Sequence, residues 1–232
     1  MKTSLVTVSA LALFTCSVIS AEPAADVKAA AKKLAAKPNY SWTSTPKSES
    51  GNTPGSGPTE GQTEKDGFTY VTFSIGNNDI ELAFKGDKAA IKREGEWAGL
   101  EELQGDNAWI ARRLKQFKAP AAEAEDLIEK VEDLKKGENG VYTGDLTESG
   151  VKELFSRLRR RETGPTPEGA KGWAKFWITD GVLSKYQYKV QGKLTVGEDK
   201  REVEINRTTT VEIKDLGSTK VKLPEEAKKK LS

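Results

Sequence analysis

Two long segments near the C-terminal end of the chain, residues 173–179 and 182–196, constrain the fold most strongly. They flank Asp180-Gly181, a dipeptide that favours the two-residue turn of a β-hairpin. With this dipeptide as the whole loop, the register places four aromatic residues on one face of the hairpin: Trp173, Trp177, Tyr186 and Tyr188. The chain is therefore predicted to end in long antiparallel strands, which a second hairpin continues into residues 202–214.

The rest of the chain alternates between strand patterns and helix patterns. Further strands are predicted at four places, residues 40–43, 68–75, 80–85 and 89–92. Helices are predicted at four places, residues 26–37, 106–117, 120–137 and from about residue 147 onward. Antiparallel strands with helices inserted in mid-chain indicate an α+β fold, in which a single curved antiparallel sheet carries helices on one face.

Residues 45–67 interrupt this pattern. They consist of Pro, Gly, Ser, Thr, Glu and Lys with almost no apolar side chain. Such a stretch buries too little apolar surface to offset the entropy of ordering it. We therefore predict a mobile polar loop at residues 45–67.

The first 21 residues have the pattern of an export signal. Lys2 precedes an apolar run from Leu5 to Ile19, and Ala21 supplies a small residue at the cleavage point. We expect residues 22–232 to form a single domain, with no transmembrane segment after the signal is cleaved. An alternative is a lipid anchor on Cys16, three residues after a leucine. Both routes predict an exported protein, in the periplasm or outside the cell.

The composition excludes several kinds of chemistry. The chain has no histidine, and its one cysteine and one methionine lie in the predicted signal. Ser-His-Asp and Cys-His catalysis, His/Cys zinc sites and disulfides are therefore excluded from the mature chain, and we predict no cofactor and no metal site. Of 37 basic residues, all but Lys2 remain after cleavage, against 35 acidic residues. This near-neutral balance gives no reason to expect a nucleic-acid partner.

Two charged clusters are typical of solvated helix surfaces. Carboxylates crowd the predicted helix between Glu123 and Asp133, and nothing in the pattern marks a desolvated pair. The basic run at residues 157–161 fits the C-terminal end of a helix, where cations interact favourably with the helix dipole. We predict no catalytic residue. A carboxylate-dependent hydrolase stays open as an alternative, because it needs only two acids that face each other across a cleft.

The aromatic row of the C-terminal hairpin has two interpretations. Aromatic pairs across neighbouring strands commonly form part of a hydrophobic core. The same row would also suit the floor of an apolar cavity, because Trp and Tyr carry polar groups that fit an amphiphilic ligand. The sequence does not decide between them.

The order of the predicted elements resembles that of the outer-membrane lipoprotein-carrier superfamily, which includes mycobacterial lipid-binding lipoproteins. The resemblance rests on the export signal, the alanine-rich N-terminal helix, the Gly95-Glu96-Trp97 turn and the strand pair at residues 176–186. It implies an unclosed half-barrel with helices on its concave face, which holds acyl chains without covalent chemistry. It also implies a set of candidate ligand-binding residues: Trp42, Trp173, Trp177, Tyr186, Tyr188, Val203 and Ile205.

The sequence supports three functional hypotheses. The first is an exported, non-catalytic envelope protein that binds a lipid or another apolar ligand, such as an acyl chain, in the half-barrel. The second is a periplasmic scaffolding protein with a filled core, whose partner is another envelope protein. The third is the carboxylate-dependent hydrolase.

Overall fold

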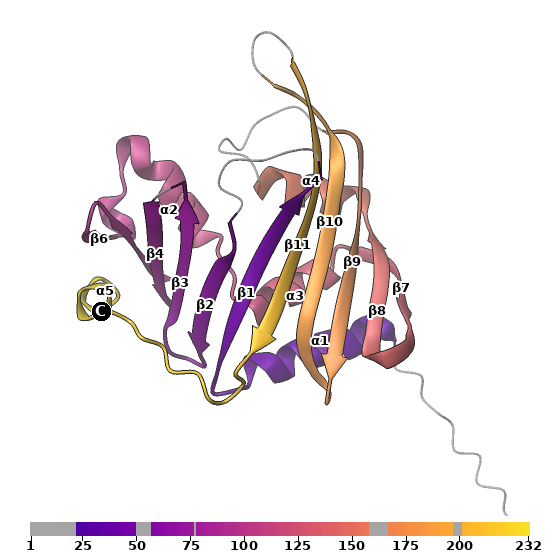
Figure 1. Ribbon diagram of the computed structural model, residues 1–232, viewed down its shortest axis with the longest axis horizontal. Helices are drawn as coiled ribbons and strands as arrows, with labels where there is room; N and C mark the ends of the chain where they lie inside the picture. Colours follow the sequence, from indigo (N-terminus) through magenta and orange to yellow (C-terminus); the bar gives the residue numbers. More distant parts are fainter. Residues whose placement is uncertain (1–21, 50–56, 77, 158–166, 197–200) are drawn as a thin grey trace, which may run out of the picture.

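The computed structural model describes residues 22–49, 57–76, 78–157, 167–196 and 201–232 (Figure 1). In these ranges the chain forms one antiparallel sheet of 11 strands in the order β6-β5-β4-β3-β2-β1-β11-β10-β9-β8-β7. The sheet is open, because its edge strands β6 and β7 do not pair with each other. The predicted α+β class and the single unclosed antiparallel sheet are confirmed. The predicted export signal lies outside the described residues.

The strands divide into two groups along the sequence. The first group comprises β1 (Asn39–Ser48), β2 (Thr59–Glu64), β3 (Thr69–Ile75), β4 (Asn78–Lys85), β5 (Lys88–Arg93) and β6 (Glu96–Gly99). The second comprises β7 (Val131–Lys136), β8 (Val141–Leu146), β9 (Glu168–Thr179), β10 (Val182–Val196) and β11 (Arg201–Lys214). The α-helices are α1 (Pro23–Ala35), α2 (Ala108–Lys115), α3 (Pro120–Ile128), α4 (Glu148–Arg157) and α5 (Glu225–Lys230). The pairing of β1 with β11 joins the two groups into one sheet.

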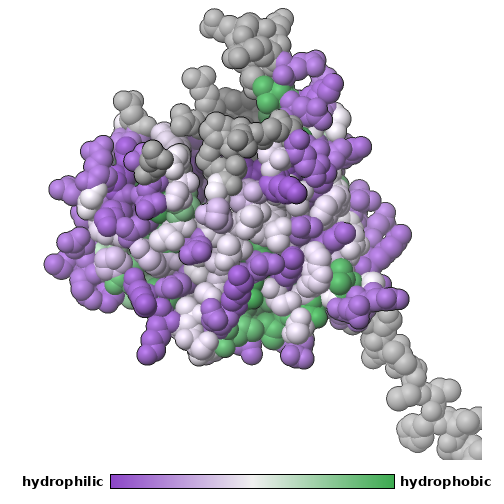
Figure 2. All heavy atoms as spheres, viewed as in Figure 1, coloured by the Kyte–Doolittle hydropathy of each residue, from purple (hydrophilic) through white to green (hydrophobic). Residues whose placement is uncertain are grey.

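Helices α1 to α4 cover one face of the sheet, which we call the inner face. Helix α1 buries one stripe of apolar residues, whose i, i+3, i+4, i+7 spacing puts them on a single face: Val27, Ala30, Ala31 and Leu34. Helix α1 packs on α3 and β10, α4 packs on β9 and β10, and α2 packs on β5. In Figure 1 the strands β9–β11 lie in front of α1 and α3, and the surface seen from this side is mostly hydrophilic (Figure 2).

Helix α5 lies on the opposite, outer face. Ala227 and Leu231 pack with Ala83 of β4, Ala90 of β5 and Trp97 of β6 in a second, smaller hydrophobic cluster. Small residues at positions 83 and 90 leave room for the helix to approach the strands. Apolar residues on one side of this otherwise charged segment therefore anchor it on the sheet.

The predicted helix 120–137 is wrong in its second half. Helix α3 ends at Ile128, and residues 131–136 form β7, which pairs with β8. The register of β7 shifts between Glu132 and Lys135, and Asp133 has a left-handed φ of 51°. This bulge turns Val131 and Leu134, three residues apart, toward the same face of the sheet, where both pack against the core. Their spacing therefore imitates that of a helix.

The predicted polar loop 45–67 is also wrong in part. Residues 45–48 continue β1. Residues 59–64 form β2, although all their side chains are polar apart from Gly61, which has none. A Cβ atom at Gly61 would lie 2.0 Å from the ring of Trp42, so this ring covers the inner face of β2. The indole Nε1 of Trp42 donates a hydrogen bond to Thr63 at 3.2 Å. The neighbouring strand thus supplies the apolar cover that β2 lacks. Residues 50–56 lie outside the described residues.

We expect Gly61→Ala to lower the free energy of unfolding by about 2 kcal/mol, because the new methyl group must displace the buried ring of Trp42. Chemical denaturation monitored by circular dichroism measures this change. Gly57→Ala is the matched control, since its Cβ would lie 3.6 Å from the nearest atom, the carbonyl oxygen of Ser74. Equal unfolding free energies for the two variants would contradict the packing of Trp42 on Gly61.

Candidate functional site

The predicted aromatic row is divided between the two faces of the sheet. The register of β9 and β10 shifts between Leu183 and Lys185, so that Trp177 pairs with Lys185 and Trp173 pairs with Lys189. The prediction that Trp173 and Trp177 share a face with the two tyrosines is therefore wrong. Ser184 is the extra residue in β10, and its hydroxyl donates a hydrogen bond to the carbonyl of Trp177 at 3.2 Å.

Trp173 and Trp177 lie half-buried on the outer face. The ammonium of Lys175 lies 5.0 Å from the ring centroid of Trp173, and that of Lys185 lies 5.2 Å from the ring of Trp177. Such cation–π contacts stabilise a solvated aromatic surface. These two tryptophans do not reach the inner face of the half-barrel.

Tyr186 and Tyr188 do face the helices, but helix α3 fills the space in front of them. The hydroxyl of Tyr186 donates a short hydrogen bond to the carboxylate of Glu123, and the hydroxyl of Tyr188 lies 3.5 Å from the same carboxylate. Tyr186 and its cross-strand partner Phe176 are completely buried. This half of the inner face is thus a closed core with a buried polar centre.

Burial raises the pKa of Glu123, although the hydrogen bond from Tyr186 and the charge of Arg157 oppose this effect. The prediction of a solvated carboxylate surface between Glu123 and Asp133 is therefore wrong at Glu123. The pattern gave no sign of this, because the tyrosines that hold Glu123 lie more than 60 positions further along the chain.

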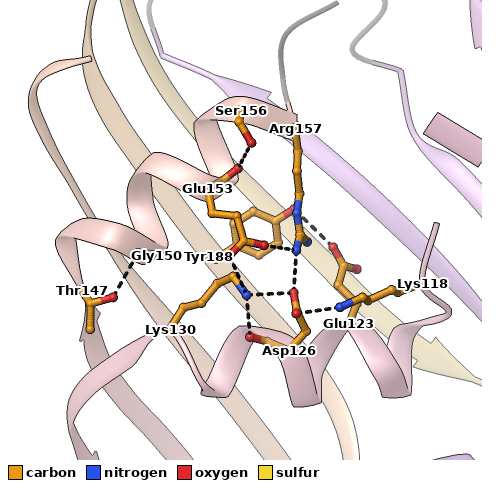
Figure 3. A network of polar contacts seen from close by, with 10 residues as sticks. All are labelled: Lys118, Glu123, Asp126, Lys130, Thr147, Gly150, Glu153, Ser156, Arg157 and Tyr188. Atoms are coloured by element: carbon orange, nitrogen blue, oxygen red, sulfur yellow. Dashed lines mark hydrogen bonds and ion pairs between the residues drawn. The ribbon is translucent and has the colours of Figure 1, made fainter. Parts of the chain in front are cut away.

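Asp126, one helical turn after Glu123, is the centre of a second polar network (Figure 3). Its carboxylate is bound by Lys118 at 2.6 Å, Arg157 at 2.6 Å and Lys130 at 3.1 Å. Burial alone would raise its pKa, but the hydrogen bonds from these three cations outweigh burial and hold the pKa of Asp126 well below its usual range. Glu153 of α4 completes the network by binding Arg157 at 2.7 Å.

This network joins helix α3 to the C-terminal end of α4. Arg157 begins the basic run predicted to be solvated, yet it is half-buried and bound to two carboxylates. Residues 158–161 of the run lie outside the described residues. Of the two acids that α3 turns toward the core, Glu123 is bound by tyrosines and Asp126 by lysines and an arginine.

The other predicted binding residues lie in three different environments. Trp42 is buried and packs with Phe117 at a ring-centroid distance of 6.4 Å, and Phe117 stacks on Phe84 at 4.1 Å. Ile205 is partly buried against the core, whereas Val203 is 42% exposed. The seven predicted residues therefore do not converge on one site.

A cavity of about 400 Å³ opens instead at the other end of the inner face, between β3–β5 and helix α2. The strands contribute five apolar side chains to its wall: Phe73, Ile80, Leu82, Phe84 and Ile91. The segment around α2 contributes four more: Trp109, Ile110, Leu114 and Phe117. Within the described ranges, the charged residues that line it are three arginines, Arg93, Arg113 and Arg157.

The cavity exists because α2 is short. Ile80, Leu82 and Phe84 alternate along β4 and face the inner side, where they need an apolar cover. Helix α2 has only eight residues, about two turns, and Leu114 is its buried residue. The helix therefore covers part of this apolar surface and leaves the rest accessible. Trp109 at the start of α2 is 36% exposed.

The described residues offer little support for other kinds of site. No group of three potential metal ligands occurs among them. None of the helices in the described ranges has the length and apolar character needed to span a bilayer.

Comparison with known proteins supports the fold. No protein-family model matches the sequence, and the search of curated proteins gives no match. The lipoprotein LppX from Mycobacterium tuberculosis matches with a TM-score of 0.50 at 11% identity, over 86% of this chain and 97% of LppX. LprF from Mycobacterium bovis matches with a TM-score of 0.45 at 10% identity, over 88% of this chain and 97% of LprF. A LolA-superfamily protein from Nitrosomonas europaea gives 0.34 at 8% identity, over 87% and 94% of the two chains. The chain therefore shares the fold of LppX, in agreement with the lipoprotein-carrier architecture that the resemblance predicted.

Proposed function

We propose that this protein is an exported, non-catalytic envelope protein that binds a lipid or another apolar ligand in the cavity between β3–β5 and α2. The observation that carries the proposal is the cavity itself, with a volume of about 400 Å³ and nine apolar or aromatic side chains in its wall. Small-molecule sites commonly have volumes of about 300–1,000 Å³ and linings of this kind. The export signal expected at residues 1–21 and the likeness in fold to a lipoprotein support an envelope location.

The lining indicates how a ligand would be selected. Burial of each methylene group contributes about 0.8 kcal/mol, and few directional hydrogen bonds are available in the wall. Affinity should therefore rise with the length of an alkyl chain until the cavity is full. Among the residues that the structure describes, the wall offers no nucleophile with an adjacent base. Glu123 and Asp126 are bound by tyrosines and cations elsewhere in the core.

A second candidate function, scaffolding by a filled core, is favoured by the other half of the sheet. Phe155, Phe176 and Tyr186 are completely buried there and leave the space between β9–β10 and the helices occupied. In this alternative the cavity at α2 has no ligand, and the protein acts through another envelope protein. The two candidates make opposite predictions for ligand uptake.

We expect Ile80→Trp to weaken lipid binding by about tenfold or more, because the larger side chain fills part of the cavity that Ile80 lines. The measurement is native mass spectrometry of the protein purified from its own envelope, followed by titration of the delipidated protein with fatty acids of increasing length. Val203→Trp is the matched control, since Val203 is exposed and does not line the cavity. Repeated preparations without bound lipid, and no uptake of any added fatty acid, would refute the lipid-binding function and favour the scaffold.

A further inference from the structure

Two stacked phenylalanine rings belong to the wall of the cavity at α2. The ring centroids of Phe84 on β4 and of Phe117, which follows α2, lie 4.1 Å apart, and the ring planes differ by 13°. Leu114, the buried residue of α2, lines the cavity as well. The same three residues also line a second hollow of about 180 Å³. We call Phe84, Leu114 and Phe117 the partition.

The two hollows lie on opposite sides of the partition. On β4, Leu82 before Phe84 lines the cavity, and Lys85 after Phe84 lines the second hollow. On β5, Ile91 lines the cavity, whereas Ala89, which pairs with Phe84, lines the second hollow. The other two elements divide in the same order, cavity first and second hollow next: Phe73 and Thr69 on β3, and Ile110 and Lys115 on α2. All four elements therefore place the partition between the two hollows.

The lining residues of the cavity differ in exposure along its length. Trp109 at the start of α2 and Arg93 at the end of β5 are exposed, whereas Phe84 and Leu114 at the partition are buried. We propose that an alkyl chain enters from the exposed end and that Phe117 sets the greatest length of chain that the cavity accepts. This inference rests on the proposed function, because it names the residue that selects among ligands of the same cavity.

Phe117 is the member of the partition that lies outside the regular elements. Phe84 is held in the sheet, where it pairs with Thr69 on β3 and Ala89 on β5. Phe117 lies between α2 and α3 and is partly buried, and its ring also packs with that of Trp42 at a centroid distance of 6.4 Å. Truncation of Phe117 therefore opens the partition without changing a residue of the sheet.

The second hollow differs from the cavity in its chemistry. Ala89 and Ala119 provide apolar wall there, but four charged residues line it as well: Lys85, Asp87, Lys88 and Lys115. The partition keeps the end of a bound chain apart from these charges. Without the ring of Phe117, a longer chain reaches the apolar part of the second hollow, so the selected length increases.

The test uses saturated fatty acids with even numbers of carbons, from octanoate to hexadecanoate. Isothermal titration calorimetry, with each probe below its micelle concentration, measures their affinities for the delipidated mature protein. We expect the affinity of the wild type to rise about fourfold for each added methylene group and then to level off at one chain length. In Phe117→Ala the levelling-off should occur at a chain longer by about two carbons or more. Shorter chains should bind to Phe117→Ala within about threefold of the wild type.

Phe68→Ala is the matched control, because Phe68 is a partly buried phenylalanine that lines neither hollow. It should leave the selected length unchanged. Phe117→Leu, which keeps an apolar side chain, should shift the length in the same direction by a smaller amount, and it decides the test if Phe117→Ala does not fold.

Three results would overturn the inference and leave lipid binding intact. They are the same selected length in the wild type and the Phe117 variants, an equal shift in Phe68→Ala, and an affinity that never levels off in the wild type. Failure of every fatty acid to bind the wild type would overturn the proposed function as well.

Discussion

Phe176→Ala should lower the free energy of unfolding by about 4 kcal/mol, whereas Trp177→Ala should lower it by about 1 kcal/mol or less. Phe176 is completely buried beside Tyr186 on the inner face, so its removal leaves a cavity in a closed core. Trp177 is half-buried on the outer face beneath Lys185, where solvent replaces the lost contacts. Chemical denaturation of the two variants, with unchanged m-values, measures the difference.

The comparison tests the register of the C-terminal hairpin. A two-residue loop without the bulge at Ser184 would turn Trp177 inward and Phe176 outward, and the order of the two effects would then be reversed. Lys185→Ala serves as a control for the cation–π contact, and it should change stability by only about 0.5 kcal/mol because exposed contacts of this kind are weak. A large effect at Trp177 together with a small one at Phe176 would refute the described register.

The regular parts of this fold were predictable from local patterns. The predicted helices at 26–37 and from about residue 147 are present as α1 and α4, and each buries apolar residues spaced three or four positions apart. The Asp180-Gly181 turn was also predicted, and both residues have the positive φ angles that such a turn requires. In each case one short stretch of sequence contains the whole signal.

The wrong predictions have two physical causes. Some strands contain a single extra residue, and some residues pack against partners that are distant along the chain. One extra residue in β10, Ser184, reverses the faces predicted for Trp173 and Trp177. One extra residue in β7 makes a strand look like a helix. Strand β2 needs no apolar alternation of its own, since the ring of Trp42 on β1 covers Gly61. None of these effects leaves a periodic pattern that identifies it.

The cavity could be predicted only in its parts. The alternation of Ile80, Leu82 and Phe84 places them on one face of a strand, and the spacing of Ile110, Leu114 and Phe117 places them on one face of a helix. It did not show that these faces meet or that α2 is too short to close the space between them. The arginines come from three separate elements, so their convergence depends on tertiary structure alone.

Asp126→Asn should lower the free energy of unfolding by about 3 kcal/mol at neutral pH, because it removes the negative charge that Lys118, Lys130 and Arg157 share. The substitution weakens the contact between α3, which carries Asp126, and α4, which carries Arg157 (Figure 3). Urea denaturation between about pH 7 and pH 2 measures this difference and its pH dependence.

The pH dependence has a definite sign. The pKa of Asp126 is depressed in the folded protein, so the stability that its ionisation contributes is fully present above the unfolded pKa of about 4. It is lost as the pH falls from about 4 toward 2, because the unfolded chain takes up the proton before the folded one. The difference between the wild type and Asp126→Asn should therefore narrow over this range. A constant difference would show that the carboxylate acts by shape and not by charge.

Glu123→Gln is the matched control on the same helix, and the contribution of Glu123 to stability has the opposite pH dependence. Burial raises the pKa of Glu123, so the folded protein takes up this proton before the unfolded chain does as the pH falls. Glu123 thus favours folding more at acid pH, and it loses this contribution as the pH rises from the unfolded value of about 4.3 through its raised pKa. The amide oxygen of glutamine can still accept the hydrogen bond from Tyr186, so Glu123→Gln should cost about 1 kcal/mol or less at neutral pH. If both variants lose stability equally and with the same pH dependence, the two carboxylates belong to one electrostatic unit, and the separate roles assigned to Glu123 and Asp126 are wrong.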